Sequence, residues 1–310
     1  MNGVLIIDKP AGMTSHDVVT RVRKIIGERR VGHTGTLDPF ATGVLVVLVG
    51  RATRIAQFLS GAEKEYEATV RLGYATDTGD RTGAPVESEL HAKPQSTQGL
   101  RKAEIEAAVA SFRGEIEQLP PMYSAKKVAG RKLYEHARRG EEIERSPVRV
   151  TIHEFELLSD ELSASEDGSI DFRVRVICSA GTYIRTLAED LGQKLGVGAH
   201  LAELRRTRAG RFKIEESSTL ENLAEIFERK AISDALISPH HALSDLPVVE
   251  LDEDNLRRTL HGLDVPLNDN DWSLSEGDPV RLSKDNQLIA IGKFDSERRA
   301  IHPGIVLATS

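Results

Sequence analysis

One carboxylate in this chain lies in a setting suited to chemistry. Asp38 belongs to residues 32–43, where glycine, threonine and proline surround a single acid, and the apolar run 44–49 follows at once. This composition predicts a tight loop that presents Asp38 at the mouth of a buried strand. A carboxylate held there, partly shielded from water, can act as a nucleophile. The same residues also fit an Asx-turn, in which Asp38 only accepts hydrogen bonds from nearby backbone amides.

A cation that could keep Asp38 ionised is Arg185. In residues 178–192 a strand ends, a glycine permits a close turn and a helix begins, and Arg185 comes from the first turn of that helix. An arginine fork fits a single carboxylate. The alternative is a surface helix in which Arg185 pairs with Glu189 one turn later. Spacing alone leaves open whether residues 38 and 185 meet.

Other kinds of site are absent from the sequence. There is no GxxxxGK[ST] phosphate loop, GxGxxG, HExxH or GxSxG motif, and the ten histidines lack metal-ligand spacing. Cys178 is the single cysteine, which excludes a disulfide framework and suits a reducing compartment. No signal peptide and no stretch of ~20 apolar residues is found. We therefore expect a cytoplasmic protein without membrane contact.

The charge is divided unevenly along the chain. The 310 residues carry a net charge of −7, which taken whole argues against a nucleic-acid partner. Residues 1–213, however, hold 32 Lys and Arg against 29 Asp and Glu, a net +3, whereas residues 214–310 hold 9 against 19, a net −10. Local basic surfaces, not net charge, meet phosphates, so an RNA or DNA partner stays possible.

Two basic clusters lie in the first part of the chain. Both fit a phosphate-binding surface, and both also fit ordinary solvated helix faces. One consists of Lys126, Lys127, Arg131, Lys132, Arg138 and Arg139, and the other of Arg205, Arg206, Arg208, Arg211 and Lys213.

The elements that must position these residues mix helices and strands without regular alternation. Apolar runs predict strands at 4–7 and 44–49, and period-two alternation predicts strands at 66–72 and 170–176. Helical spacing predicts helices after Thr14 or Ser15 and over 182–195. These patterns favour an α+β fold with a mixed sheet, two insertions, at 77–99 and after Pro120, and a small β-rich module from about residue 246.

Five segments, in order along the chain, resemble motifs of the pseudouridine synthase family. The resemblance extends over residues 3–213, and the match weakens beyond residue 213. The five segments are residues 5–15 (LIIDKPAGMTS), 35–43 (GTLDPFATG), 64–66 (KEY), 120–127 (PPMYSAKK) followed by Gly130 and Arg131, and 178–192 (CSAGTYIRTLAEDLG).

The resemblance implies a mixed-sheet pseudouridine synthase catalytic domain at 1–245, with a thumb-like RNA-gripping insertion at about 113–147, and a PUA-like C-terminal domain at 246–310. It implies isomerisation of uridine to pseudouridine at position 55 in the T arm of tRNA, with no cofactor or metal, by a monomer without an obligate protein partner. Asp38 would attack either C1′ of the ribose or C6 of the base, Arg185 would pair with Asp38, and Tyr66 would stack on the base near C5.

The resemblance also implies RNA contacts. The target nucleotide must leave the folded T loop, at a cost of a few kcal/mol. His33 matches the residue that fills the vacated stacking space, Tyr183 and Leu204 match pocket-lining positions, and Asp80 lies in a polar loop that could touch RNA. The thumb residues that would grip phosphates are Lys126, Lys127, Arg131 and Lys132. The acidic C-terminal module would add few contacts, such as Lys293.

Two other functions fit the same sequence. One is a tRNA-binding folding chaperone, in which base extrusion matters and catalysis is secondary; the set Asp38, Tyr66 and Arg185 argues against a purely non-catalytic chaperone. The other is a guide-RNA-dependent pseudouridine synthase, in which a ribonucleoprotein supplies specificity. The basic insertion favours action without a guide.

Overall fold

The computed structural model describes residues 1–86, 97, 99–124, 126–128, 130–137, 139–141, 143–159, 162–165, 167–267 and 273–308, apart from the side chains of residues 127, 128, 132, 134 and 137. The strands of the main sheet are β1 (Gly3–Lys9), β2 (Val31–Thr34), β3 (Thr42–Val49), β4 (Lys64–Leu72), β5 (Gly114–Gln118), β8 (Val148–Leu157), β9 (Ser163–Ala164), β10 (Ile170–Cys178), β11 (Ala199–Ala209) and β12 (Phe212–Lys213). The helices around it are α1 (Ser15–Ile26), η1 (Gly50–Ile55), α2 (Ala56–Ser60), α3 (Lys102–Ala110), α5 (Ile184–Lys194), η2 (Ile214–Glu216), α6 (Leu220–Glu228), α7 (Ile232–Ala235) and α8 (Pro239–Ala242).

The sheet is mixed. Among the described residues it has ten strands, with the central order β1-β3-β11-β4-β10-β8-β5, and β2, β9 and β12 pair at its sides. The pairing of β11 with β3 is parallel, whereas the other strand pairs among the described residues of this sheet are antiparallel. The α+β class predicted from the sequence is confirmed, and the parallel junction brings β11 beside the strand that follows Asp38.

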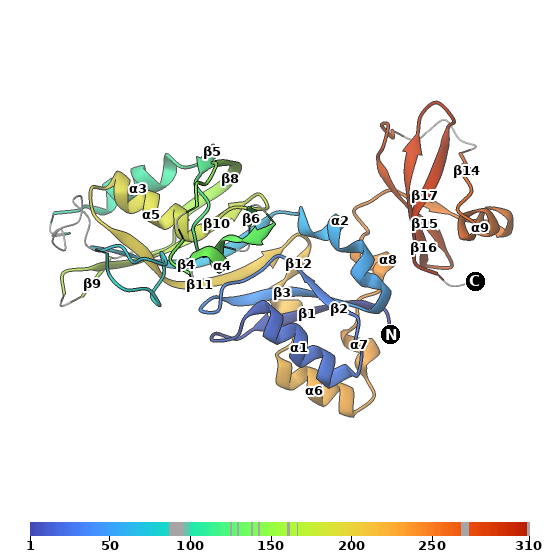
Figure 1. The fold of residues 1–310 in the computed structure, drawn as a ribbon, viewed down its shortest axis with the longest axis horizontal. Coiled ribbons are helices and arrows are strands. Elements are labelled where there is room, and N and C mark those ends of the chain that lie inside the picture. Colours follow the sequence, from blue (N-terminus) through green and yellow to red (C-terminus); the bar gives the residue numbers. More distant parts are fainter. Residues whose placement is uncertain are drawn as a thin grey trace.

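Strands β1 and β3 are buried on both faces, which explains their unbroken apolar runs. On one face Leu5, Ile7 and Leu45 pack against α1 and α6, and on the other Val4 and Ile6 pack against Phe212 and Ala242. Helix α1 begins where expected, because the Thr14 hydroxyl accepts a hydrogen bond from the Asp17 amide and the Asp17 carboxylate accepts one from the Thr14 amide. In Figure 1, α1 and α6 lie side by side beneath this half of the sheet.

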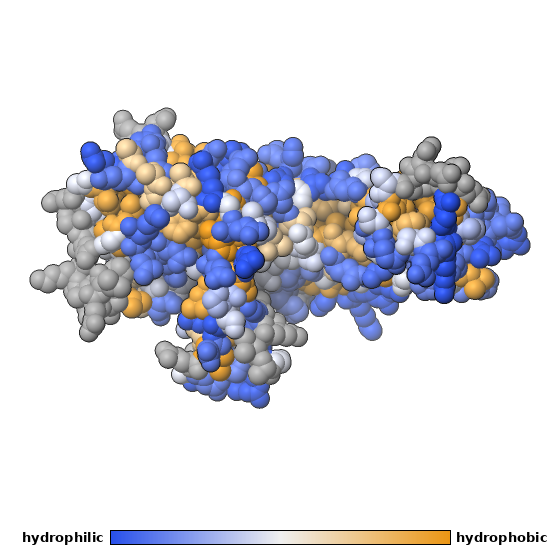
Figure 2. Space-filling model, turned by 90° about the horizontal axis from the view of Figure 1, so that it is seen from above, coloured by the Kyte–Doolittle hydropathy of each residue, from blue (hydrophilic) through white to orange (hydrophobic). Residues whose placement is uncertain are grey.

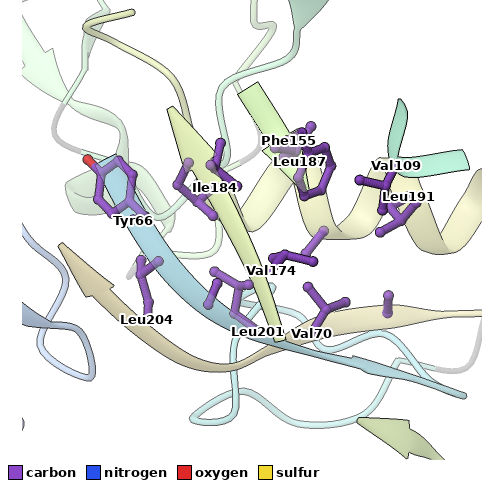
Figure 3. Close-up of a cluster of buried hydrophobic side chains, with 14 of the residues drawn as sticks. Tyr66, Val70, Val109, Phe155, Val174, Ile184, Leu187, Leu191, Leu201 and Leu204 are labelled. Atoms are coloured by element: carbon purple, nitrogen blue, oxygen red, sulfur yellow. The ribbon is translucent and has the colours of Figure 1, made fainter. Parts of the chain in front are cut away.

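Strands β4 and β10 alternate as predicted, and each buries one face. Val70 and Val174 lie in a core that helices α3 and α5 cover, with Leu187 and Leu191 of α5 facing the sheet. Figure 3 shows Tyr66 at the end of this cluster, with its hydroxyl oxygen directed away from the apolar side chains. The core thus ends at a polar group.

The thumb-like insertion leaves the sheet between β5 and β8. It contains the two-stranded sheet of β6 (Lys127–Val128) and β7 (Arg131–Lys132), followed by α4 (Leu133–Ala137). Residues 114–118 form β5 and pair with β8, so the segment outside the sheet is 119–147 and not 113–147. Within the other predicted insertion, 77–99, residues 87–96 and 98 lie outside the described residues.

The C-terminal part forms a second sheet. Its strands are β13 (Val248–Glu250), β14 (Val265–Pro266), β15 (Pro279–Lys284), β16 (Gln287–Asp295) and β17 (Ala300–Val306), with helix α9 (Glu253–Leu260). It lies at one end of the molecule (Figure 1). Arg51 and Arg54 of η1 donate hydrogen bonds to the carbonyl oxygens of Leu307 and Val306 and fix the module to the turn that follows β3.

No helix in the described ranges is long and apolar enough to cross a membrane. Hydrophilic side chains dominate the face seen in Figure 2, and apolar side chains appear there in separate groups.

The parallel contact of β3 with β11 requires glycine at position 43. A Cβ atom there would lie 2.2 Å from the backbone oxygen of Arg206, and φ is +102°. We expect Gly43→Ala to lower the free energy of unfolding by more than about 2 kcal/mol, because both the clash and the left-handed backbone must be accommodated. Urea unfolding followed by circular dichroism measures this.

The matched control is Gly196→Ala, where φ is +73° and no atom lies within 4 Å of the added Cβ. Only the left-handed backbone has to be accommodated there, so we expect Gly196→Ala to lower the free energy of unfolding by about 1 kcal/mol. Equal losses in the two variants would mean that the β3–β11 contact is not the constraint.

Candidate active site

Asp38 lies in a loop that buried polar groups hold by its backbone. The Lys9 ammonium, which is fully buried, donates hydrogen bonds to the carbonyl oxygens of Pro39 (3.3 Å) and Ala41 (2.6 Å). The Ser15 hydroxyl accepts from the Leu37 amide at 2.9 Å and donates to the Leu37 carbonyl oxygen at 3.1 Å. Groups from β1 and α1 therefore hold the backbone on both sides of Asp38, at Leu37 before it and at Pro39 and Ala41 after it. This is more than a local Asx-turn.

The Asp38 carboxylate meets the Arg185 guanidinium. Arg185 Nε lies 2.9 Å from Asp38 Oδ2, and 5% of the Arg185 side chain is exposed against 34% of Asp38. The guanidinium is thus enclosed, while part of the carboxylate stays open to a substrate. Burial raises the pKa of Asp38 above its ordinary value, and the Arg185 charge opposes that rise.

The remaining donors of Arg185 fix two loops. Its Nη1 donates to the Thr78 carbonyl oxygen at 2.7 Å, and its Nη2 donates to the Tyr123 carbonyl oxygen at 2.6 Å, at the start of the thumb. The alternative surface pair with Glu189 is not formed in the described structure. Glu189 instead lies against Gly79, where an added Cβ would be 2.2 Å from its Oε1, and burial raises the pKa of Glu189 to about 7.

Asp80 lies behind Arg185. It is 4% exposed, and its Oδ1 accepts hydrogen bonds from the Thr78 hydroxyl (3.0 Å) and from the Thr82 amide (2.9 Å) and hydroxyl (2.5 Å). Its Oδ2 is 3.9 Å from Arg185 Nη1. The residues that line the cavity do not include Asp80, so its contact in this structure is with Arg185 and the loop.

A cavity of about 240 Å³ opens beside Asp38. Tyr66 of β4, Leu204 of β11 and Tyr183, which directly precedes α5, contribute to its wall. The buried Gln118 side chain fixes the Tyr183 backbone, because its Oε1 accepts from the Tyr183 amide and its Nε2 donates to the Tyr183 carbonyl oxygen. The full lining is Gly35, Thr36, Leu37, Asp38, Ser60, Lys64, Tyr66, Ser124, Ser179, Gly181, Thr182, Tyr183, Ile184, Arg185, Leu204 and Arg206.

Two buried cations in this wall were not singled out as site residues from the sequence. Arg206 was assigned to a basic surface, yet it is 1% exposed, and it donates to the carbonyl oxygens of Val44 (2.7 Å) and Gly35 (3.0 Å). Lys64 is 7% exposed. The signal was present in the sequence, because period-two alternation from Leu204 directs Arg206 inward.

The second basic cluster is therefore not a free cationic surface. Besides the burial of Arg206, Arg205 pairs with Asp8 at 2.8 Å and Arg208 pairs with Glu65 at 3.4 Å. Local partners neutralise both charges, and sequence order along β11 could not reveal partners on other strands. The interpretation of this cluster as a basic surface is wrong.

The other predicted RNA contacts lie outside the cavity. His33 is on β2 opposite Val47, just ahead of the Asp38 loop, and is not part of the cavity wall. Lys126 is half-buried and Arg131 is exposed on the thumb. The side chains of Lys127 and Lys132 lie outside the described residues.

Burial also sets the protonation of the neighbours. It raises the pKa of the Tyr66 phenol, although the nearby Arg206 charge lowers it, so Tyr66 enters the site as a neutral ring. It raises the pKa of Cys178 to about 11, which leaves an unreactive thiol. It lowers the pKa of Lys64 and of Lys9 to about 8.

The contact with Arg185 predicts how the pKa of Asp38 changes when the guanidinium is removed. In Arg185→Gln we expect the pKa of Asp38 to rise further, because the charge that opposes its desolvation is gone. A ¹³C NMR titration of the aspartate carboxyl carbons measures it. In Arg205→Gln, which breaks the Asp8 pair instead, the Asp38 titration should stay as in the wild type; an unchanged or lower Asp38 pKa in Arg185→Gln contradicts the assignment.

The chain matches known families over most of its length. Residues 23–184 match the TruB family pseudouridylate synthase N-terminal domain, and residues 185–268 match the tRNA pseudouridylate synthase B C-terminal domain. A relative from Bacillus cytotoxicus named tRNA pseudouridine synthase B is 48% identical over 264 residues, 85% of this chain and 84% of that protein. One of the same name from Bacillus thuringiensis is 42% identical over 306 residues, 99% of this chain and 95% of that protein.

Solved structures are similar over the whole chain. An H/ACA RNP bound to a substrate RNA containing 2′-deoxyuridine has a chain with a TM-score of 0.73 and 28% identity, covering 99% of this chain and 85% of that one. A chain of an archaeal box H/ACA sRNP complex has a TM-score of 0.70 and 29% sequence identity, and the match covers 99% of this chain and 86% of that one. Together with the family matches and the two Bacillus relatives, these similarities show that the chain belongs to the TruB family of pseudouridylate synthases.

Proposed function

We propose that this protein isomerises uridine to pseudouridine in tRNA, at position 55 of the T arm, acting alone and without a cofactor. The observation that carries the proposal is a partly open carboxylate, Asp38, held 2.9 Å from a buried guanidinium at the wall of a cavity. The names of the Bacillus relatives support tRNA as the substrate.

The reaction moves one bond and needs no second reactant. Asp38 Oδ attacks C1′ of the ribose or C6 of the base; in the first case the C1′–N1 bond breaks and its electron pair leaves on N1. The freed base turns within the cavity, C5 forms the bond to C1′, and the bond from Asp38 to the sugar breaks. The C5 proton then leaves and N1 takes up a proton, so the product is an isomer of the substrate. An enclosed cavity suits this sequence, because the detached base must neither escape nor be replaced by water.

The cavity wall supplies the positioning. The base stacks on Tyr66, whose ring forms one end of the apolar core, with Leu204 on the neighbouring strand. A base inside a folded loop has to be extruded, at a cost of a few kcal/mol, to reach this position. His33 on β2 is the side chain that we assign to the vacated stacking space, and Asp80 supports Arg185.

Phosphate contacts come from the thumb. Arg131 is exposed there, and Lys126, Lys127 and Lys132 are its neighbours in sequence. Such contacts orient the RNA without reading its bases. A guide-RNA-dependent function is less well supported, because the H/ACA chains are 28–29% identical to this chain, whereas the tRNA pseudouridine synthase B relatives are 42–48% identical.

The central test uses the protein alone with an unmodified T-arm hairpin. We expect the wild-type protein to form pseudouridine at the target uridine, and Asp38→Asn to form none while keeping RNA affinity within several-fold, because the change removes the nucleophile but not the grip. Chemical mapping of pseudouridine and filter binding measure the two quantities. If the wild-type protein forms no product, action without a guide RNA is ruled out. If Asp38→Asn is fully active, Asp38 is not the nucleophile.

The thumb assignment predicts a change in salt dependence. Neutralising Lys126, Lys127, Arg131 and Lys132 together should weaken RNA binding and flatten the slope of log affinity against log salt, by roughly 0.9 for each lost duplex contact or about 0.7 for each single-strand contact. Binding isotherms at several salt concentrations measure the slope. A quadruple variant with the wild-type slope would show that the thumb does not hold phosphates.

A further inference from the structure

The wall of the active-site cavity contains positive charge that no carboxylate in the described structure balances. Lys64 donates its hydrogen bonds to the backbone carbonyl oxygens of Ser60 and Ala62. Arg206 donates to the carbonyl oxygens of Val44 and Gly35. Neither cation forms an ion pair among the described residues, although both are more than nine-tenths buried.

These cations do not stand alone. Arg185, in the same wall, is also buried and is the cation that contacts Asp38 and Asp80, and the buried Lys9 lies under the Asp38 loop. Carbonyl dipoles solvate an ammonium or guanidinium only in part, and burying a charge without a counter-ion is costly. A protein keeps such an excess where a ligand or a transition state brings the opposite charge.

Lys64 and Arg206 lie next to each other at the place where the base would sit. A Cβ atom on Gly35, in the Asp38 loop, would be 3.5 Å from Arg206 Nη1 and 3.9 Å from Lys64 Cε. Arg206 is also opposite Tyr66 across the β11–β4 pair, and Lys64 precedes Tyr66 by two residues on the same face of β4. A base stacked on Tyr66 therefore has both cations beside it.

The chemistry of the proposed function supplies the missing anion. Attack at C1′ leaves the electron pair of the C1′–N1 bond on the pyrimidine, where it spreads to O2 and O4. Attack at C6 also transfers negative charge into the ring and its carbonyl oxygens. In both routes the base gains charge as the first bond changes, and it loses that charge again when the product forms.

We propose that Lys64 and Arg206 form an electrostatic site that stabilises the pyrimidine as it becomes an anion during the isomerisation. The proposal rests on the proposed function and adds these two residues to the reaction. Their charges are already in place before the substrate enters, because backbone carbonyls fix both groups, so no reorganisation is needed at the moment of bond breaking.

The charge on Lys64 can be varied with pH. Burial and the Arg206 charge lower its pKa to about 8, whereas the Cys178 thiol on β10, the titratable neighbour across the strand, keeps its proton until about pH 11. The pKa of Tyr66 also lies above its ordinary value, because its phenol is buried. Lys64 is therefore charged below about pH 8 and neutral above it.

The test compares single-turnover rates of wild type and Lys64→Met on the T-arm hairpin at about pH 6.5 and about pH 9.5. At the lower pH we expect Lys64→Met to be slower by roughly 100-fold with hairpin affinity nearly unchanged, since one preorganised charge is lost. At the higher pH the gap should shrink at least about tenfold, because wild type has lost the same charge. Lys9, whose pKa is also about 8, titrates in both proteins, so its effect cancels when the wild-type rate is divided by the Lys64→Met rate at each pH.

The controls separate the possible failures. Lys24→Met removes an exposed lysine at the end of α1 and should leave the rate unchanged. Lys64→Gln keeps a donor toward the two carbonyls and replaces Lys64→Met if circular dichroism shows that the latter is unfolded. A rate ratio that is the same at both pH values would overturn the proposal and leave Lys64 a packing role. Absence of product with wild-type protein would instead refute the proposed function itself.

Discussion

The contact between Asp38 and Arg185 is the constraint on which the rest of this site depends. The Arg185 guanidinium is enclosed by protein, so its partners must lie within the protein. They are the Asp38 carboxylate, one carbonyl oxygen from each of two loops, and, at 3.9 Å, the Asp80 carboxylate. Removing the carboxylate would leave this buried guanidinium without its nearest counter-charge, which is unfavourable. Arg185 therefore fixes three parts of the site relative to one another: the Asp38 carboxylate, the loop at Thr78 and the start of the thumb at Tyr123.

The loop around Asp38 shows the same principle applied to the backbone. Lys9, Ser15 and Arg206 come from three different elements, and each uses its polar group on a carbonyl or amide of the loop. A nucleophile needs an orientation that survives the approach of its substrate. Because the peptide groups on both sides of Asp38 are fixed by other residues, its carboxylate does not have to hold the loop and pairs with Arg185, which fits the nucleophilic role that we propose for it.

Local pattern predicted the elements and singled out Asp38 and Arg185, whereas the pairing of these two residues was implied by the family resemblance and not by the pattern. The alternation of β4 and β10 and the small residues around Asp38 are properties of short stretches, so they could be recognised in the sequence. The meeting of Asp38 with Arg185 depends on sheet order, in which β11 separates β3 from β4, and spacing carries no such information. Arg206 was misassigned for a related reason, because a run of arginines on one strand mixes inward and outward positions.

The acidic surplus of the chain is shared between the two parts of the molecule. Residues 214–245 belong to the acidic segment in sequence, but they form η2, α6, α7 and α8, which pack on the large sheet. The body of residues 1–245 therefore holds 34 Lys and Arg against 36 Asp and Glu, a net −2, and residues 246–310, which build the five-stranded module at one end of the molecule (Figure 1), hold 7 against 12, a net −5. Neither part attracts a polyanion from a distance by its net charge. Attraction has to come from local cationic groups, within about 8 Å under physiological conditions, so the fit of the two surfaces decides the orientation.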